Sequence, residues 1–270
     1  SNTANNWLFG IWGTSGSDVY AVGGGGAIVR YNGTSWSAMT SGTAQTLRAV
    51  WGASGRDVFA VGYGGAILRY DGTAWSVMTS GTTQNLYGVW GTSRADVFVV
   101  GDNGTVLHYD GTAWTAMTSG TTSSFRAVWG ASGSDVFVVG SVVRHYDGST
   151  WASALNSLPC TAYGVWGTSH SEVYAVGCSG TVVRYDGTSW ISGYDGTLGT
   201  LYAVWAPAGA DPYAVGNAVS SGSVLRGVRG GTVTVSAPST TAMPMGATRQ
   251  LGATAYVGSV AQTGVSFQWT

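Results

Sequence analysis

The residues best suited to binding chemistry recur along this chain at a fixed spacing. A basic side chain, usually followed by Tyr, returns at Arg30, Arg69, His108, His145, Arg184 and Arg226. A guanidinium group beside a Tyr ring can bind a carboxylate or a glycan through paired hydrogen bonds. The same group can equally form an ion pair with an Asp of a neighbouring repeat. A ligand-binding role and a structural role therefore both stay open for this basic column.

Acidic residues form two further columns. The first contains Asp18, Asp57, Asp96, Asp135, Glu172 and Asp211. The second lies in Y-D-G-T turns and contains Asp71, Asp110, Asp147 and Asp186, with Asn32 at the matching place. A ring of carboxylates could bind cations, but Asp and Asn at turn positions commonly accept backbone N–H groups. We expect this structural role in both columns, and no metal site is predicted.

Tryptophan occupies two columns with the same interval. The first contains Trp12, Trp51, Trp90, Trp129, Trp166 and Trp205, and the second contains Trp36, Trp75, Trp114, Trp151 and Trp190. Indole faces can stack on sugar rings, which would suit a lectin. Packing between repeats explains a Trp in every repeat more simply, since each would bury on the order of 150–250 Å². Packing is the favoured interpretation, and sugar binding is the alternative.

Residues suited to catalysis or to cofactor binding are few. His108 and His145 belong to the basic column, and His170 stands in a loop. The sequence contains no H-x-x-x-H, C-x-x-C or G-x-S-x-G motif, and no helix follows Gly23–Gly26 to bind a phosphate. Glycoside hydrolysis needs two carboxylates in different environments, whereas nearly every acid here belongs to a column. We expect neither an enzyme nor a cofactor, and only the irregular fourth and fifth repeats could contain an asymmetric site.

Two cysteines predict a disulfide bond. Cys160 precedes the first strand of the fifth repeat, and Cys178 follows its second strand. A hairpin centred on Ser169 pairs Val165 with Val173 and Tyr163 with Ala175, which also places Cys160 opposite Cys178. Directly opposed positions lie close to disulfide distance. A disulfide between Cys160 and Cys178 implies an oxidising compartment.

The columns require a repeating structural element. A unit of the form L-x-A-V-W-G-T-S-G-S-D-V-F-A-V-G-x-G-G-T-V-L-R-Y-D-G-T-S-W recurs six times. In the second unit the pattern predicts strands at Leu47–Trp51, Asp57–Val61, Ala66–Tyr70 and Trp75–Thr79, joined by turns rich in Gly and Asp. Four strands in about 40 residues are typical of a β-propeller blade. The predicted fold class is all-β, a propeller of six four-stranded blades, with a seventh possible from sequence outside these residues.

The repeats also predict the domain organisation. They start near residues 8, 47, 86, 125, 162 and 201, so residues 1–230 form the propeller. Ser1–Asn6 aligns with the connection that follows a fourth strand. The sixth repeat loses its D-G-T-x-W strand, which either Gly227–Val235 supplies irregularly or something outside these residues replaces. Residues 231–270 follow a different pattern and form a second, partial domain.

Two resemblances follow from these motifs. The segment with T-V-T-V-S-A-P, G-A-T-R-Q-L-G-A-T-A and V-S-F-Q-W-T resembles the opening half of bacterial group-2 Ig-like domains, so we expect the natural protein to continue past Thr270. The repeat resembles bacterial repeats of the form L-x-A-V-W-G…D-V-Y-A-V-G…Y-D-G-x-x-W, which are common in large secreted or surface proteins. Its layout is similar to the photosystem assembly-factor propellers and the Asp-box repeats of sialidases. The resemblance implies a propeller but little about activity, because propellers serve many functions.

Composition limits the classes of function. Charged residues make up 9% of the chain and the net charge is −1, so the basic surface that nucleic-acid binding needs is missing. No run approaches the ~18 apolar residues of a membrane span. We expect a non-catalytic scaffold or adhesion module at the cell surface or outside the cell, with the periplasm possible, as a piece of a longer surface or filament protein. Its partner would be another protein or its own copies; the alternative is a multivalent lectin that binds glycans through the basic column.

Overall fold

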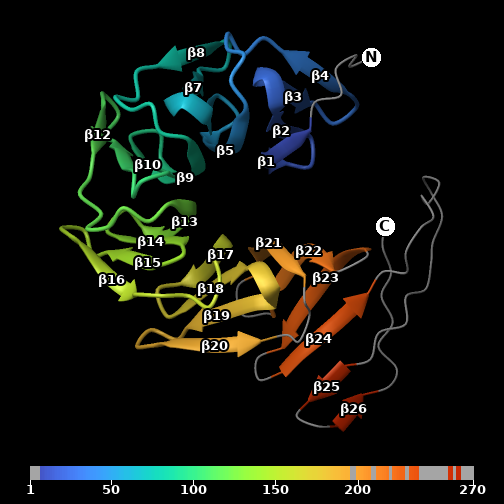
Figure 1. Ribbon diagram of the computed structural model, residues 1–270. Helices are drawn as coiled ribbons and strands as arrows, with labels where there is room; N and C mark the ends of the chain where they lie inside the picture. Colours follow the sequence, from blue (N-terminus) through green and yellow to red (C-terminus); the bar gives the residue numbers. More distant parts are fainter. Residues whose placement is uncertain are drawn as a thin grey trace. The chain divides into compact units, whose positions relative to one another are not determined.

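The computed structural model describes residues 7–194, 199–207, 211–218, 221–228, 231–236, 255–257 and 260–262 (Figure 1). Antiparallel strands, joined in chain order, form six four-stranded sheets and one two-stranded pair. The helical segments in these ranges are short 3-10 turns, and none has the length and apolar character needed to cross a membrane. The predicted all-β fold of six four-stranded sheets is therefore confirmed.

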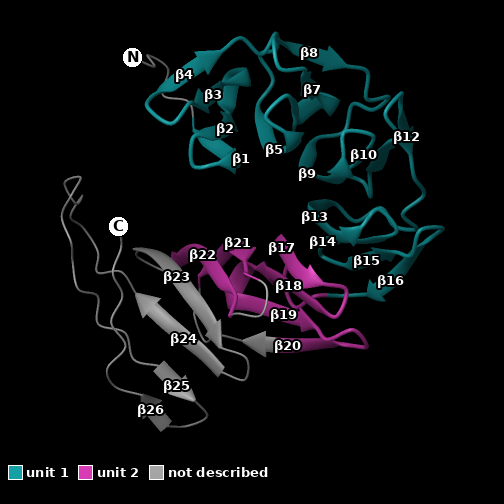
Figure 2. Cartoon of the chain, turned by 180° about the vertical axis from the view of Figure 1, so that it is seen from behind, with its two compact units in different colours: residues 1–157 teal, residues 158–270 magenta. Residues whose placement is uncertain are grey.

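The chain divides into two compact units, Ser1–Ser157 and Leu158–Thr270 (Figure 2). We number the sheets 1 to 6 in chain order. The strands of the first unit are β1 (Leu8–Ser15), β2 (Asp18–Gly23), β3 (Ile28–Tyr31) and β4 (Trp36–Met39) in sheet 1; β5 (Leu47–Ser54), β6 (Asp57–Gly62), β7 (Ile67–Tyr70) and β8 (Trp75–Met78) in sheet 2; β9 (Leu86–Ser93), β10 (Asp96–Gly101), β11 (Val106–Tyr109) and β12 (Trp114–Ala116) in sheet 3; β13 (Phe125–Ser132), β14 (Asp135–Gly140), β15 (Val143–Tyr146) and β16 (Trp151–Leu155) in sheet 4.

The second unit contains sheets 5 and 6 and the two-stranded pair. Its strands are β17 (Ala162–Ser169), β18 (Glu172–Gly177), β19 (Thr181–Tyr185) and β20 (Trp190–Tyr194) in sheet 5; β21 (Thr200–Trp205), β22 (Tyr213–Ala218), β23 (Ser221–Val228) and β24 (Gly231–Ser236) in sheet 6; and β25 (Ala255–Val257) with β26 (Val260–Gln262). Short 3-10 turns follow the second strand of sheets 1, 2 and 5: η1 (Gly24–Gly26), η2 (Tyr63–Gly65) and η3 (Cys178–Gly180).

The fourth strand of sheet 6 is formed by residues after the last regular repeat. β24 begins at Gly231, where the sequence places the start of the Ig-like segment, and pairs with β23. Ser1–Asn6 and most of the Ig-like segment after residue 236 lie outside the described residues. The Ig-like domain and its boundary at residue 230 therefore stay predictions.

The pairing of the first strand with the second is interrupted twice in sheets 1 to 5 and once in sheet 6. In sheet 2, Leu47 is opposite Gly62 and Ala49 is opposite Val61, so Arg48 is an additional residue in a β-bulge. A second irregularity lies next to the hairpin, and the other five sheets have the bulge at the equivalent place. A bulge leaves one residue without a cross-strand partner and changes the direction of its side chain.

The Y-D-G-T turns between the third and fourth strands have the structure that the sequence predicts. The Oδ1 atom of Asp71 accepts hydrogen bonds from the amides of Thr73 at 2.8 Å and Ala74 at 2.9 Å. Gly72 has a φ of 96°, in the left-handed region that favours glycine. Asn32 accepts the equivalent two amides in sheet 1. The structural role predicted for this acidic column is confirmed.

The core lies between consecutive sheets. Val58, Ala60 and Val61 on the second strand of sheet 2 have no exposed surface, because that strand lies inside its sheet and is covered on both faces. Tyr20 and Val22 of sheet 1 form one cluster with residues of sheet 2, including Leu47. Stacking of sheet on sheet therefore buries the apolar run of the second strand in sheets 1, 2 and 3.

Within the first unit, sheets 1 and 2 differ in how far their equivalent apolar residues are covered. Ile11 is 70% exposed and Trp36 is 50% exposed, whereas their equivalents in sheet 2, Val50 and Trp75, are 7% and 8% exposed. The residue type does not explain the difference in exposure, because Trp36 and Trp75 are both Trp. Trp75 is covered because it packs against Tyr20 of sheet 1. A sheet of this repeat cannot bury its own apolar faces.

Candidate functional site

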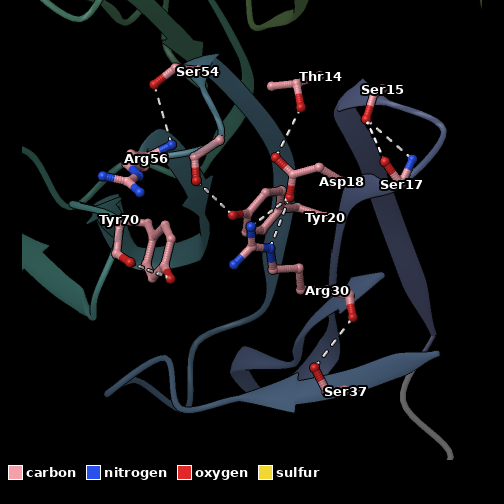
Figure 3. A network of polar contacts seen from close by, with 12 residues as sticks. Thr14, Ser15, Ser17, Asp18, Tyr20, Arg30, Ser37, Ser54, Arg56 and Tyr70 are labelled. Carbon is pink, nitrogen blue, oxygen red and sulfur yellow. Dashed lines mark hydrogen bonds and ion pairs between the residues drawn. The ribbon is translucent and has the colours of Figure 1, made fainter. Parts of the chain in front are cut away.

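The basic column and the first acidic column meet within each sheet of the first unit. Arg30 donates from Nε to Asp18 at 2.9 Å, and Arg69 forms an ion pair with Asp57 at 2.5 Å (Figure 3 shows the pair in sheet 1). His108 pairs with Asp96 at 2.7 Å and His145 with Asp135 at 2.6 Å. The sequence led us to consider an Asp of a neighbouring repeat, but these partners come from the same sheet.

The first acidic column does not serve the hairpin amides in the way the sequence suggests. Asp18 accepts the hydroxyl of Thr14 at 2.9 Å as well as Arg30, while the hairpin amide of Ser17 donates to the Oγ atom of Ser15 (Figure 3). The carboxylate also lies against Gly55 of sheet 2, where an added Cβ would collide with it. Asp18 therefore joins strands of its own sheet and supports the hairpin of the next.

Tyr20 continues this contact between sheets. Its hydroxyl donates to the carbonyl oxygen of Gly55 at 2.9 Å. Burial is the main reason why the pKa of Tyr20 is raised to about 12, so the hydroxyl keeps its proton and remains a donor. For Arg30, burial works against the charge, but the hydrogen bond to Asp18 raises its pKa overall. The group is a stable structural network in which both charged side chains are already paired.

Members of both tryptophan columns pack between sheets, as the sequence predicts. The indole of Trp12 lies on Gly52 of the next sheet so closely that a Cβ there would collide with it, and Trp51 meets Gly91 in the same way. In the second column, the edge of Trp75 contacts Tyr20 of the preceding sheet, with ring centroids 6.3 Å apart. In sheets 2, 3 and 4 the Gly after the first-column Trp is therefore explained by the indole of the sheet before it.

The predicted disulfide is present. Cys160 and Cys178 are bonded, with their Cα atoms 5.6 Å apart. The register from which we predicted it is wrong: Val165 pairs with Ala175 and not with Val173. The two irregularities of the first strand cause the error, because each adds a residue to one side of the hairpin. Cys178 lies in η3, beyond the end of the paired strands.

The bulge positions contain residues that the sequence analysis did not select. They are the variable x of the L-x-A-V-W pattern, and they are Phe9, Arg48, Tyr87, Arg126, Tyr163 and Tyr202. Aromatic residues and Arg fill all six places, although the repeat imposes no residue type there. Bulges are common beside functional sites, where they redirect a side chain. This restricted choice at a variable position was the signal that could have revealed them.

In the first unit these residues form a continuous row across four sheets. The Cζ atom of Arg48 lies 4.3 Å from the centre of the Phe9 ring and 5.8 Å from that of Tyr63, the first residue of η2. Tyr63 contacts Tyr87 edge to face at 6.1 Å, and Arg126 lies 4.1 Å from the ring centre of Tyr87. We call Phe9, Arg48, Tyr63, Tyr87 and Arg126 the aromatic–arginine row. Cation–π contacts of this kind hold the guanidinium groups in place.

A carboxylate lies at one end of the row. Asp102, which belongs to neither acidic column, accepts hydrogen bonds from Tyr87 at 2.9 Å and Asn85 at 3.1 Å, and lies 3.7 Å from Arg126. Burial opposes its ionisation, but hydrogen bonds from Ser124, Tyr87 and Asn85 and the charge of Arg126 together lower the pKa of Asp102. At this end of the row the positive charge of Arg126 is therefore balanced by the negative charge of Asp102.

A groove elsewhere in the first unit offers less chemistry. It has a volume of about 470 Å³ and is lined by Met78, Thr79, Gly81, Thr112, Ala113 and Trp114. None of these side chains is charged, so the aromatic–arginine row is the better candidate for specific binding.

Comparison with known proteins supports the fold. No model of a known protein family matches the sequence, and no curated protein matches it. Among solved structures, the chain is similar to YCF48 bound to a D1 peptide (14% identity, TM-score 0.65, 84% of this chain and 78% of that chain covered). It is also similar to YCF48 from Cyanidioschyzon merolae (14%, TM-score 0.64, 84% and 83%) and to the WD40 repeats of RRP9 (9%, TM-score 0.68, 83% and 78%).

These neighbours define the class of fold. The chain has the β-propeller fold, assembled from four-stranded antiparallel sheets as in YCF48 and the WD40 repeats of RRP9. At 9–14% identity the similarity concerns the fold alone.

Proposed function

We propose that this chain is a non-catalytic scaffold module that binds a protein partner on the aromatic–arginine row, at the cell surface or outside the cell. The observation that carries the proposal is the restriction of the bulge positions to aromatic residues and Arg. In the first unit the basic residues of the repeat, Arg30, Arg69, His108 and His145, already contact Asp side chains of their own sheets. The residue type at the bulge positions, in contrast, differs from sheet to sheet. Tyr, Trp and Arg are the residues that contribute most to protein interfaces.

Two further observations support parts of this proposal. One structural neighbour, YCF48, was solved with a D1 peptide, so a propeller of this type can bind a peptide. The Cys160–Cys178 disulfide favours an oxidising compartment.

A multivalent lectin is the weaker proposal. It would use the basic column, but Arg30, Arg69, His108 and His145 each contact an Asp carboxylate of their own sheet. The indoles that would stack on sugars pack largely between sheets. A glycan would have to break these contacts, whereas a partner on the row would not.

The test is a parallel binding screen of the whole chain against displayed random dodecapeptides and a glycan array. We expect peptides to be enriched, and their binding to be lost in the double variant Tyr63→Gly/Arg126→Ala. Tyr63→Gly is compatible with folding because Gly24 occupies the same place in sheet 1. Arg56→Ala, at an exposed hairpin Arg of sheet 2, is the control and should keep binding. Glycan binding alone, or peptide binding that the row variant leaves unchanged, would contradict the proposal.

A further inference from the structure

Arg48 differs from the other arginines of the first unit that lie in the columns or the row. Its guanidinium contacts the rings of Phe9 and Tyr63. Among the described residues it has no carboxylate within ion-pair distance and no side-chain hydrogen bond. Arg30 and Arg69 are paired with Asp, and Arg126 lies beside Asp102. Arg48 is thus a half-buried cation that is oriented but not neutralised.

We infer that Arg48 is the anchor for a carboxylate, and that the row binds a linear peptide segment with one acidic side chain beside neutral or aromatic residues. This inference rests on the proposed function. A planar guanidinium binds a carboxylate through two parallel hydrogen bonds, and stacking on rings leaves its N–H edges available for them. Because the contacts with Phe9 and Tyr63 already fix the side chain, binding a carboxylate costs little further ordering.

The opposite end of the row limits the charge of the ligand. The carboxylate of Asp102 is ionised at neutral pH, since its hydrogen bonds and Arg126 lower its pKa. A second acidic group next to Tyr87 would meet this negative charge and would be disfavoured. The row therefore selects a single acidic residue near Arg48, followed by uncharged residues along Tyr63 and Tyr87.

A peptide fits this arrangement better than an acidic sugar does. Sugar recognition by aromatic residues uses the flat faces of the rings, and guanidinium groups already cover one face of Phe9 and one of Tyr87. The groups left to a ligand include the edge of the Arg48 guanidinium, the hydroxyl of Tyr63 and the second N–H of the Asn85 side-chain amide. These groups suit the side chains and backbone of an extended peptide.

The experiment compares two libraries of acetylated and amidated nonapeptides, one with a single central Glu among neutral residues and the other with Gln in its place. Fluorescence polarisation against the whole chain should show binding to the Glu library about tenfold tighter, a difference of about 1.4 kcal/mol. In Arg48→Gln this preference should vanish, so that the Glu library and the Gln library bind with equal affinity. Arg48→Lys should recover only part of the preference, because an ammonium group cannot make the paired hydrogen bonds.

Each outcome separates the inference from the proposed function. Arg56→Gln removes the same charge from the same sheet and should leave the Glu preference intact. If both libraries bind equally and binding still depends on Tyr63 and Arg126, the anchor role of Arg48 is wrong but the function stands. If neither library binds and oligogalacturonate does, both are wrong. Circular dichroism melting of each variant establishes that a lost preference does not come from unfolding.

Discussion

The carboxylates of the Y-D-G-T turns show how one residue can serve the fold without serving a ligand. The hydroxyl of Thr73 and then the amides of Ala74 and Thr73 lower the pKa of Asp71 from 3.8 to about 2. Asp110 and Asp186 are lowered to about 2 in the same way, and Asp147 is lowered as well. These carboxylates are exposed or partly exposed, so their hydrogen bonds and not burial set the shift.

This shift predicts a specific sensitivity to acid. The folded-state pKa lies below the unfolded value, so the turns stabilise the fold above about pH 4, and this contribution is lost as the pH falls toward 2. Replacing Asp by Asn in the four turns keeps a side-chain oxygen that accepts the two backbone amides, as Asn32 does in sheet 1. It also removes the carboxyl group that titrates. We expect the melting temperature of this variant to fall less than that of the wild type between pH 4 and pH 2. Identical pH profiles in thermal melts would contradict this account, and Asp71→Ala should lower the melting temperature at neutral pH as well.

The residue scale also shows where sequence reasoning succeeds. Asp71 and Gly72 were predictable because turn chemistry is local and depends on residue type alone. The partner of Arg30 was not, because Arg30 and Asp18 are brought together by the pairing of β2 and β3 and by the position of Thr14. The side chain of Arg226 lies outside the described residues, so its role stays a prediction.

At the scale of elements, the contribution of a Trp to the stability of the fold depends on whether another sheet covers it. Trp75 and Trp36 occupy the same repeat position but are 8% and 50% exposed. Trp75→Ala should lower the free energy of unfolding by about 3–5 kcal/mol, as expected for a buried Trp, and Trp36→Ala by about 1 kcal/mol. Urea unfolding followed by circular dichroism measures both, since fluorescence would change with the substitution itself. Equal losses would mean that packing between sheets is not what Trp75 provides.

The bulges explain most of what the sequence could not predict at this scale. Alternating apolar residues and Gly-rich turns placed β5 to β8 within a few residues, because these signals reflect strand period and turn type. A bulge adds one residue without changing either signal, so the register of β17 with β18 was wrong and Arg48 was overlooked. The same local feature therefore hid both the true pairing around the disulfide and the candidate site.

At the scale of the whole molecule, the Cys160–Cys178 disulfide lies within the second of the two units. In sheet 3, Gln84 and Asn85 are joined by hydrogen bonds to Asn103 and Asp102. Cys160 and Cys178 occupy the places of Gln84 and Asp102 in sheet 5, so the disulfide replaces hydrogen bonds between the same two segments. The second unit contains two full sheets against four in the first, and has fewer interfaces between sheets to stabilise it.

The disulfide should therefore stabilise the second unit and leave the first unchanged. Its cysteines are 18 residues apart, and closing a loop of this length contributes about 3 kcal/mol. In the variant Cys160→Ser/Cys178→Ser we expect hydrogen exchange to accelerate in β17 to β20, while β5 to β12 keep their protection. Reduction of the wild type should give the same pattern, which controls for the substitutions. Faster exchange spread evenly over both units would show that they unfold together. The two units on either side of Ser157 would then not differ in their stability.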